Sequence, residues 1–452
     1  MKALVLTGTL LLAGCVSYQP LPLPAHDALA TDPAHLQVDA ATMPTAGLRT
    51  HRFDPSDGLD IVEVAMLAVA NNPDLQAQRA DIGISRAQAF SAGLLPDPQL
   101  ALTRDQVMGA PAGATVAMTA GLSVDVGALL ARSSAREAGT AEHRKADLNL
   151  LWQEWQTVAK ARLLFVKLDA LRQSNELLEQ QRAALQPRLD RTRIAVERGL
   201  IGSDVVAPQL SALQDVARQR NDIERLINQS RHDLNALLGV APDLALTLVG
   251  LPELSAPDAT QVEQALAAAP RRRPDLLALQ AGYEAQDDRY RGALRAQFPA
   301  ITMGPTRGRD TSNVNTVGFS LGITLPIFNR NRGNIAIELA TRDRLRVDFQ
   351  QRLDATTGDA HRLLAENGIL VRQRADIDAA ISELDRVVGR AQAAFGAHSI
   401  DALTLTTAES ALLTKRLERV AVQQALWEQA IALQALVGTG LIATEPQDEP
   451  NS

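Results

Sequence analysis

The sequence contains the same unit twice, and this duplication constrains the fold more than any other feature. The stretch NNPDLQAQRADIGISRAQAFSAGLLPDPQLALT at 71–103 is matched about 200 residues later by RRRPDLLALQAGYEAQDDRYRGALRAQFPAITM at 271–303. Both begin a helix at Pro-Asp-Leu, continue for about 20 helix-compatible residues and stop at a proline before an alternating segment. We therefore predict two copies of one unit, at 59–239 and 260–438, joined by a linker at 240–259.

A short helix with capping-box spacing precedes each matched stretch. The spacing joins Asp60 to Glu63 in the first copy and Thr260 to Glu263 in the second. A polar residue followed three positions later by Glu is a typical helix start. The two copies are thus predicted to begin in the same way.

Each copy also carries segments in which apolar residues alternate with small or polar ones. VGFSLGITLPI at 317–327 has an apolar residue at every second position, and TVAMTAGLSVDV at 115–126 is its counterpart. This period of two places the apolar side chains on one face of a strand. A weaker strand precedes each segment, so we predict one hairpin per copy, with strands at about 99–106, 115–127, 299–307 and 314–327.

A very long helical stretch follows each hairpin. Residues 133–198 contain a single proline, Pro187, which we expect to kink or break the helix. At about 1.5 Å per residue such a helix spans roughly 100 Å. Its apolar residues fall near a period of 3.5, which predicts a coiled-coil-like seam of Leu151, Trp155, Val158, Phe165, Leu168, Leu171, Leu178, Leu185 and Leu189.

The second copy repeats this arrangement. Its long helix is predicted at 333–395, with Gly358 and Gly368 as weak points. After a short break in each copy a helix returns, at 204–238 and at 401–437. Asp204 and Asp401 are the predicted N-caps of these return helices.

The apolar strand faces are predicted to contact lipid. Four strands at the ends of such long helices have no second layer of comparable width to cover them. About 12 alternating residues is the length that a tilted strand needs to cross a bilayer. Open sheet edges are not tolerated in lipid, and bacterial barrels begin at about eight strands, so the chain is expected to oligomerise.

Composition excludes other classes of function. A net charge of −7 disfavours nucleic acid as a partner, and past the N-terminus no apolar run reaches the length of a membrane-spanning helix. The seven histidines are scattered without ligand spacing, and the six methionines do not cluster. We therefore predict no catalytic residues, no metal site and no cofactor, and the protein is not expected to be an enzyme.

The N-terminus resembles that of an exported lipoprotein. Lys2 precedes an apolar run of signal-peptide length at 1–14, and Leu-Ala-Gly-Cys at 12–15 looks like a lipobox. The resemblance implies lipidation of Cys15, the only cysteine; an ordinary signal peptide with an incidental cysteine is the alternative. Residues 15–58, which begin with a proline-rich segment, are then a tether, and 439–452 a flexible tail.

Taken together, these elements resemble the TolC-type outer-membrane efflux proteins. The resemblance covers about 58 to 440 and rests on the order and length of the elements, with LPIFNRNRGNI at 325–335 similar to the heavy-metal cation efflux branch. It implies a mainly α fold with a transmembrane β-barrel, in which a homotrimer forms a twelve-stranded barrel and a periplasmic α-helical barrel. It also implies a periplasmic adaptor and an inner-membrane pump, of RND type, as partners, with outer-membrane lipid around the barrel.

The resemblance further implies that the two tips contact the adaptor. The family pattern of Gly-Leu, a small or hydroxylated residue, Asp and an apolar pair matches fully in the first copy and partly in the second. Caps of an ordinary helix reversal are the alternative reading of the same residues. The residues concerned are Gly199, Leu200, Ser203, Asp204 and Val205 in the first copy, and Gly396, Ser399 and Asp401 in the second.

Relatives close the tunnel with an acidic ring beyond the second tip. The corresponding positions here are Thr404 and Thr407, which are not acidic; Asp401, one turn earlier, is either a substitute ring or a plain N-cap. Phe395 is either a constriction or a buried seam residue. The predicted function is the outer-membrane channel of a tripartite efflux system for metal cations, drugs or other small molecules. The alternative is a lipid-anchored periplasmic coiled-coil scaffold or adaptor without a pore.

Overall fold

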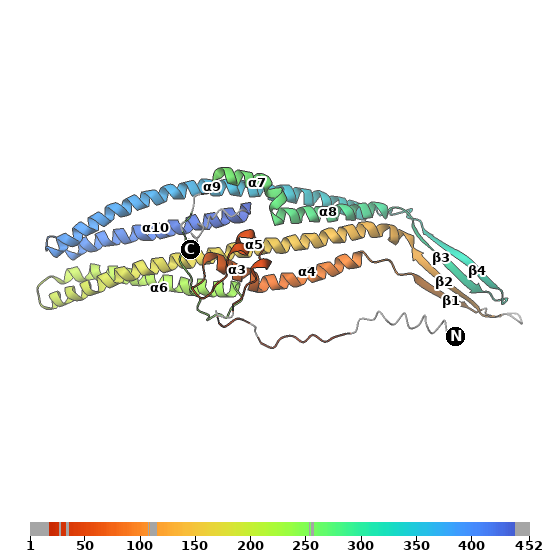
Figure 1. Ribbon diagram of the computed structural model, residues 1–452, viewed down its shortest axis with the longest axis horizontal. Coiled ribbons are helices and arrows are strands. Elements are labelled where there is room, and N and C mark those ends of the chain that lie inside the picture. Colours follow the sequence, from red (N-terminus) through yellow and green to blue (C-terminus); the bar gives the residue numbers. More distant parts are fainter. Residues whose placement is uncertain are drawn as a thin grey trace, which may run out of the picture.

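The chain forms an elongated molecule in which long helices lead into a small sheet at one end (Figure 1). The computed structural model describes residues 18–26, 29–32, 36–106, 108, 115–252, 254 and 257–438. The predicted signal peptide, Cys15 and the C-terminal tail lie outside the described residues. Residues 18–24 of the predicted tether are exposed and have no regular secondary structure.

Both halves of the chain contain the same elements in the same order, which confirms the predicted mainly α fold with two repeats. The first repeat comprises α3 (Ile61–Asn71), α4 (Pro73–Ala92), β1 (Gln99–Asp105), β2 (Ala117–Asp125), α5 (Val126–Glu197), the short 3-10 turn η3 (Ser203–Val205) and α6 (Val206–Leu237). The second comprises α7 (Ala259–Arg272), α8 (Pro274–Arg295), β3 (Ala300–Arg309), β4 (Asn315–Thr324), α9 (Arg332–Gly396) and α10 (Ala402–Val437). Two short elements, η2 (Ala40–Thr42) and α2 (Ala46–Thr50), precede the first repeat.

The first helices of the two repeats are capped differently. Asp60 and Glu63 form the predicted capping box of α3, since each side chain accepts a backbone hydrogen bond from the other residue. In α7 the prediction that Thr260 caps the helix is wrong. Asp258 is the N-cap, and its carboxylate accepts a hydrogen bond from the Thr260 amide at 2.8 Å.

The helix α5 is continuous, and it begins directly after β2 rather than at residue 133. Asp125 caps this start by accepting a hydrogen bond from the Ala128 amide at 3.0 Å. Of the two outcomes predicted at Pro187, a kink or a break, the break does not occur. Proline removes one backbone donor, which leaves the Ala183 carbonyl without its usual partner. Because Pro187 and Ala183 are both exposed, water can bind that carbonyl and the helix continues.

Each long helix packs along its return helix through an apolar seam. Leu185 and Leu189 of α5 are buried in one cluster with Leu213 and Val216 of α6. The equivalent cluster of the second repeat is smaller and contains Ile381, Val388 and Leu412. Each fully buried leucine contributes about 1.5–3 kcal/mol, so these seams hold the helical hairpins together.

The largest core lies midway along the molecule, where the two repeats meet. Phe165 and Trp427 are almost fully buried in it, together with residues of α3, α6 and the linker. Such a core ties α5 of the first repeat to α10 of the second. The described helices include none that is long and apolar enough to cross a membrane.

The four strands form one antiparallel sheet in the order β1-β2-β3-β4. The register pairs apolar residues with one another on one face, as in Leu100 with Leu122 and Ile301 with Ile323. The other face carries small and polar residues at Gln99, Ala101, Thr103, Thr119, Gly121, Ser123, Thr302, Thr306, Thr316, Gly318, Ser320 and Gly322. The predicted alternation is therefore confirmed, except at the end of the sheet farthest from the helices, where polar residues also occur on the apolar face.

The apolar face of the sheet is exposed in the single chain. Val317 is 83% exposed and Phe319 67%, although large apolar side chains in a folded protein are usually covered. At Gly304 of β3 a Cβ atom would overlap the backbone carbonyl of Leu122 in β2. This residue is therefore required to be glycine by the pairing of the two hairpins.

Candidate functional site: the helical tips and the link between the repeats

The first helical tip reverses the chain through a glycine. α5 ends at Glu197, and the Leu200 amide donates a 2.8 Å hydrogen bond to the Ala195 carbonyl. Gly199 has a φ of +68°, the left-handed conformation that closes such a helix end. Beyond it Leu200 is 71% exposed, so an apolar side chain stands uncovered at the end of the molecule.

The second tip has the same geometry with a different residue in the left-handed position. The Ser399 amide donates a 2.8 Å hydrogen bond to the Ala394 carbonyl, and His398 has a φ of +57°. His398 is therefore the structural counterpart of Gly199, and Ser399 that of Leu200. The tip pattern predicted that Gly396 corresponds to Gly199. This prediction is wrong by two residues, because Gly396 is still the last residue of α9.

The two aspartates that follow the tips have different roles. Asp401 is the N-cap of α10, and its carboxylate accepts a 2.8 Å hydrogen bond from the Thr404 amide. This hydrogen bond holds the pKa of Asp401 below its ordinary value. Asp204 lies within η3, between Ser203 and Val205, and α6 begins without a side-chain cap. The prediction that Asp204 caps α6 is therefore wrong.

The residues predicted for the gate share one face of α10. Asp401, Thr404 and Thr407 follow one another at intervals of three residues and are all exposed. Such a spacing aligns side chains along one side of a helix. The opposite side, which contains Leu405 and Thr406, is buried against the neighbouring helices.

Phe395 is half-buried and contacts the other repeat. The guanidinium of Arg188 in α5 lies 5.9 Å from the centre of the Phe395 ring, within the range of a cation–π interaction. The aromatic ring thus takes part in the contact between the two helical hairpins.

Arg188 also forms the main polar link between the hairpins. Its Nη1 and Nη2 donate to the two carboxylate oxygens of Glu409 in α10 at 2.7 and 3.1 Å. Their side chains are only 14% and 9% exposed. Nη1 also donates to the Thr406 hydroxyl at 3.3 Å, and the amide of Gln392 lies 3.4 Å from Glu409. A paired and largely dehydrated arginine–carboxylate fork is a strong and specific contact.

This pair was not among the residues predicted from the sequence. A signal was present, because Glu409 interrupts the apolar seam of α10 between Leu405 and Leu412. A charged residue in a coiled-coil seam requires a partner. Which residue supplies the partner is not encoded locally, since Arg188 lies 221 positions away.

α10 is held to α5 at a second level nearer the middle of the molecule. Arg162 of α5 donates a 2.6 Å hydrogen bond to the side-chain oxygen of Gln434. Burial lowers the pKa of Arg162 to about 10, and the charge of Asp60 opposes this decrease. Polar contacts therefore join the two repeats both near the central core and near the helical tips.

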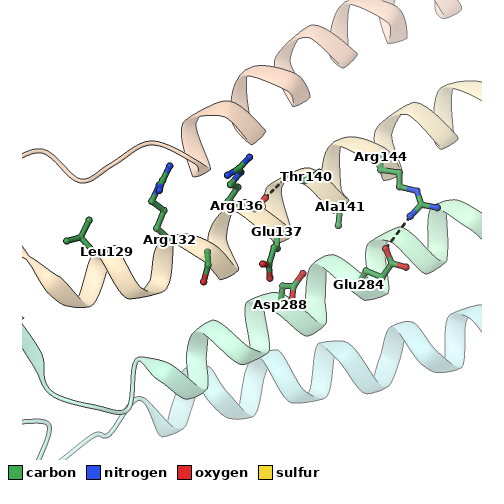
Figure 2. A pocket seen from close by; sticks show the side chains of 10 residues that line it. Leu129, Arg132, Arg136, Glu137, Thr140, Ala141, Arg144, Glu284 and Asp288 are labelled. Atoms are coloured by element: carbon green, nitrogen blue, oxygen red, sulfur yellow. Dashed lines mark hydrogen bonds and ion pairs between the residues drawn. The ribbon is translucent and has the colours of Figure 1, made fainter.

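A groove of about 620 Å³ lies between α5 and α8, close to the sheet. Figure 2 shows Glu137 and Asp288 facing each other across it, and Arg144 in an ion pair with Glu284 at 3.5 Å. Burial raises the pKa of Asp288, and the nearby Glu137 adds to this increase. The groove is lined by charges of both signs.

One cluster of the described residues has the composition of a metal site. His51, Asp60 and Glu63 place ligand atoms within 4.8 Å of one another. Both carboxylates already have structural partners, since Asp60 and Glu63 form the capping box and Glu63 also accepts the Asp54 amide at 2.7 Å. These hydrogen bonds explain why the two carboxylates lie together: they cap the start of α3.

The comparisons with known proteins agree with this architecture. The family model of the outer membrane efflux proteins matches residues 265–439. The multidrug resistance outer membrane protein MdtQ of Escherichia coli O157:H7 is 24% identical over 485 residues, which cover 95% of this chain and 96% of MdtQ.

Two solved structures show how far the fold is shared. The CmeC outer membrane channel of Campylobacter jejuni superposes with a TM-score of 0.72 at 15% identity, covering 96% of each chain. The open state of the MtrE outer membrane channel of Neisseria gonorrhoeae superposes with a TM-score of 0.68 at 17% identity, covering 94% of this chain and 98% of MtrE. The chain therefore shares the fold of these outer membrane channels, and residues 265–439 match the family model of the outer membrane efflux proteins.

Proposed function

We propose that three copies of this chain form the outer-membrane exit duct of a tripartite efflux system. The observation that carries the proposal is the exposed apolar face of a four-stranded sheet whose outer strands, β1 and β4, each have one neighbour within the chain. In lipid, the free edges of these strands must pair with another copy. Three copies supply twelve strands, so that β4 of one chain pairs with β1 of the next.

The two faces of the sheet suit this arrangement. The apolar face, with Val317 and Phe319, is suited to acyl chains, and the small and polar face then lines a water-filled passage. Small residues on the inner face keep the passage wide. The rival function, a periplasmic scaffold or adaptor without a pore, is not favoured because it leaves the exposed apolar face without a role.

The helical tips are proposed to dock on a periplasmic adaptor. Leu200 is 71% exposed, Ile201 43% and Leu403 50%, so both tips present apolar side chains at the end farthest from the sheet. Exposed apolar residues rimmed by polar ones are typical of protein contacts. The other candidate contact residues are Gly199, Ser203, Asp204 and Val205 at the first tip, with Gly396, Ser399 and Asp401 at the second.

Opening is proposed to separate the two helical hairpins of each chain. The Arg188–Glu409 pair and the contact of Phe395 with Arg188 hold α9 and α10 against α5 in the present conformation. An adaptor that binds better to the separated form shifts the equilibrium toward it. Asp401, Thr404 and Thr407 then face the opening from the exposed side of α10.

The relatives support a proposal for the partners and the cargo. An adaptor and an inner-membrane pump, of RND type, complete the system, and the pump supplies the energy and selects the cargo. MdtQ is named for multidrug resistance, which favours small organic molecules as cargo, whereas the 325–335 segment resembles the metal-efflux branch. Lipidation of Cys15 anchors the mature chain to the outer membrane.

Imaging of the detergent-extracted protein tests this proposal. We expect trimeric rods well over about 100 Å long, with a short cylinder at one end. Complementation of a strain that lacks its own outer-membrane channel provides the functional measurement. Monomers that remain in solution without detergent, and that fail to restore efflux, would overturn the proposal.

A further inference from the structure

Three arginines lie together on the apolar face of the sheet, at the end farthest from the helices. Arg104 pairs with Met118, Met118 pairs with Arg309, and Arg309 pairs with Asn315, so these four side chains share one face. Arg307 lies two residues before Arg309 and therefore on the same face. Arg307 pairs with Val317 of the apolar face.

The position of these arginines along the strands is specific. On the apolar face, the cross-strand pairs nearer the helices are Ile301–Ile323, Met303–Leu321 and Leu100–Leu122. None of these pairs contains a charged residue. The strands β1 to β4 contain arginine only at these three positions, and they contain no lysine. The positive charge therefore forms one band, which we call the arginine band, close to the tips of the hairpins.

The arginine band has no acidic partner among the described residues. The three side chains are exposed and take part in none of the ion pairs that connect other arginines of the described chain. Asp105 points to the opposite face of β1, since it is adjacent to Arg104. Asp310 is engaged in the turn between β3 and β4, where its carboxylate accepts the Ser312 and Val314 amides at 2.9 Å each. The turn of the first hairpin, residues 106–116, contains no acidic residue.

An unpaired arginine on a lipid-facing strand surface is destabilising at the centre of a bilayer, but the penalty almost disappears at the headgroup level. If the uncharged part of the apolar face lies in the hydrocarbon core, the arginine band lies at the headgroup level. Its ligand must therefore be an anionic group at the membrane surface. Arginine rather than lysine favours a group that accepts two parallel hydrogen bonds, as a phosphate does.

We propose that the arginine band binds the phosphate groups of a phosphorylated glycolipid in the membrane leaflet at the hairpin tips. Arg104 and Arg309 are two strands apart, about 10 Å, and Arg307 and Arg309 are about 7 Å apart along β3. One phosphate can be held by Arg307 and Arg309 and a second by Arg104. A lipid with two phosphates on one headgroup engages the whole arginine band. The inference rests on the proposed function, because it requires this face of the sheet to contact lipid.

The test compares the wild-type protein with two variants that lack selected arginines, each purified as the full chain in detergent. The triple variant Arg104→Gln, Arg307→Gln, Arg309→Gln removes the arginine band. The control variant Arg330→Gln, Arg332→Gln removes exposed arginines at the other end of the sheet, where α9 begins. Binding is measured by native mass spectrometry with diphosphoryl lipid A, with monophosphoryl lipid A, with phosphatidylcholine and with inorganic phosphate as competitor.

We expect diphosphoryl lipid A to bind the wild type and the control alike, and monophosphoryl lipid A to bind more weakly. Each arginine removed should weaken binding of diphosphoryl lipid A about fivefold, with phosphatidylcholine unaffected. Equal affinity of the triple variant and the wild type would overturn the proposal. Displacement of the lipid by millimolar inorganic phosphate would also overturn it, since the site would then be a free-anion site.

Assembly and efflux separate this proposal from the proposed function. The oligomeric state of each variant in detergent is measured in parallel with its ability to restore efflux. If all three proteins assemble and transport while the triple variant retains its lipid affinity, the proposed lipid site is wrong. The proposed duct function is then unaffected. If the wild type neither inserts nor transports, the proposed duct itself is wrong. A further variant replaces the same three arginines with lysines and so keeps the positive charge. It provides the affinity comparison if the triple glutamine variant fails to assemble. Its affinity for diphosphoryl lipid A should be lower than that of the wild type but higher than that of a sheet without these positive charges.

Discussion

Arg188 and Glu409 join the two repeats near the helical tips, with guanidinium nitrogens 2.7 and 3.1 Å from the carboxylate oxygens. The pair links α5 of the first repeat to α10 of the second, and it is largely buried. The pair holds the two hairpins together near the tips, alongside Leu413 and Leu417 of α10, which pack against the apolar seam of the first repeat.

Removing either partner is expected to loosen the tips. Arg188→Ala leaves the Glu409 carboxylate buried without its partner, which destabilises the contact by about 3 kcal/mol. Single-channel recordings in planar bilayers should show a higher open probability. The reciprocal exchange, Arg188→Glu with Glu409→Arg, should restore much of the closed state. Arg218→Ala is the control, because the Arg218–Asp215 pair is exposed and lies within one helix; an equal effect there would contradict the role of Arg188.

The tips should respond to substitutions according to their backbone conformation. Gly199→Ala forces a side chain into a left-handed conformation and is expected to destabilise the first tip by about 1 kcal/mol. Gly396→Ala is the matched control, since Gly396 is helical and no atom would lie within 4 Å of the new Cβ. His398→Gly should stabilise the second tip for the same reason that Gly199→Ala destabilises the first. Hydrogen exchange of the tip amides measures all three, and equal responses of Gly199→Ala and Gly396→Ala would be inconsistent with the geometry.

Pairing of the two hairpins depends on Gly304. Gly304→Val places side-chain atoms where the Leu122 carbonyl lies, so β2 and β3 separate and the sheet cannot form. We expect the variant to lose the assembled oligomer in detergent and to fail in efflux complementation. Gly333→Ala, at the start of α9, should assemble normally because its Cβ meets open space. Normal assembly of Gly304→Val would show that the hairpins do not pair as described.

The groove beside the sheet should make stability depend on pH. The pKa of Asp288 is raised by burial, so its protonated form is favoured in the folded state. This contribution is fully present below the ordinary carboxyl pKa of 3.8 and is lost as the pH rises through the raised pKa. Asp288→Asn should therefore raise the melting temperature at pH 7 and reduce its dependence on pH above 3.8.

The neighbouring Asp287 provides the control for this prediction. It forms ion pairs with Arg291 at 2.7 Å and with Arg342 at 3.2 Å. Asp287→Asn should accordingly lower the melting temperature at pH 7. If both substitutions shift the melting temperature in the same direction, burial is not the dominant influence on Asp288.

Lipidation of Cys15 is tested by metabolic labelling with a palmitate analogue. Wild-type protein should carry the label, and Cys15→Ser should carry none, because the thiol is the acceptor of the lipid. Export of an unlabelled wild-type protein would contradict the lipobox prediction and favour an ordinary signal peptide.

Much of the architecture could be predicted because it is encoded in local periodicity. The alternation in 317–327 and the seam around Leu185 each follow from which side of a strand or helix must avoid water. Boundaries were less predictable, since they depend on single capping residues. Asp125 starts α5 directly after β2, and Asp258 rather than Thr260 starts α7.

The duplicated units, the long helices and the uncovered apolar strand face are all encoded in the spacing of residues along the chain. Which residues meet across the two repeats depends instead on the packed three-dimensional arrangement. The pairing of Arg188 with Glu409 and the alignment of Arg104 with Arg309 depend on the register between elements far apart in sequence. Register is decided by the packing of whole helices and strands, a collective property that no single stretch of residues encodes.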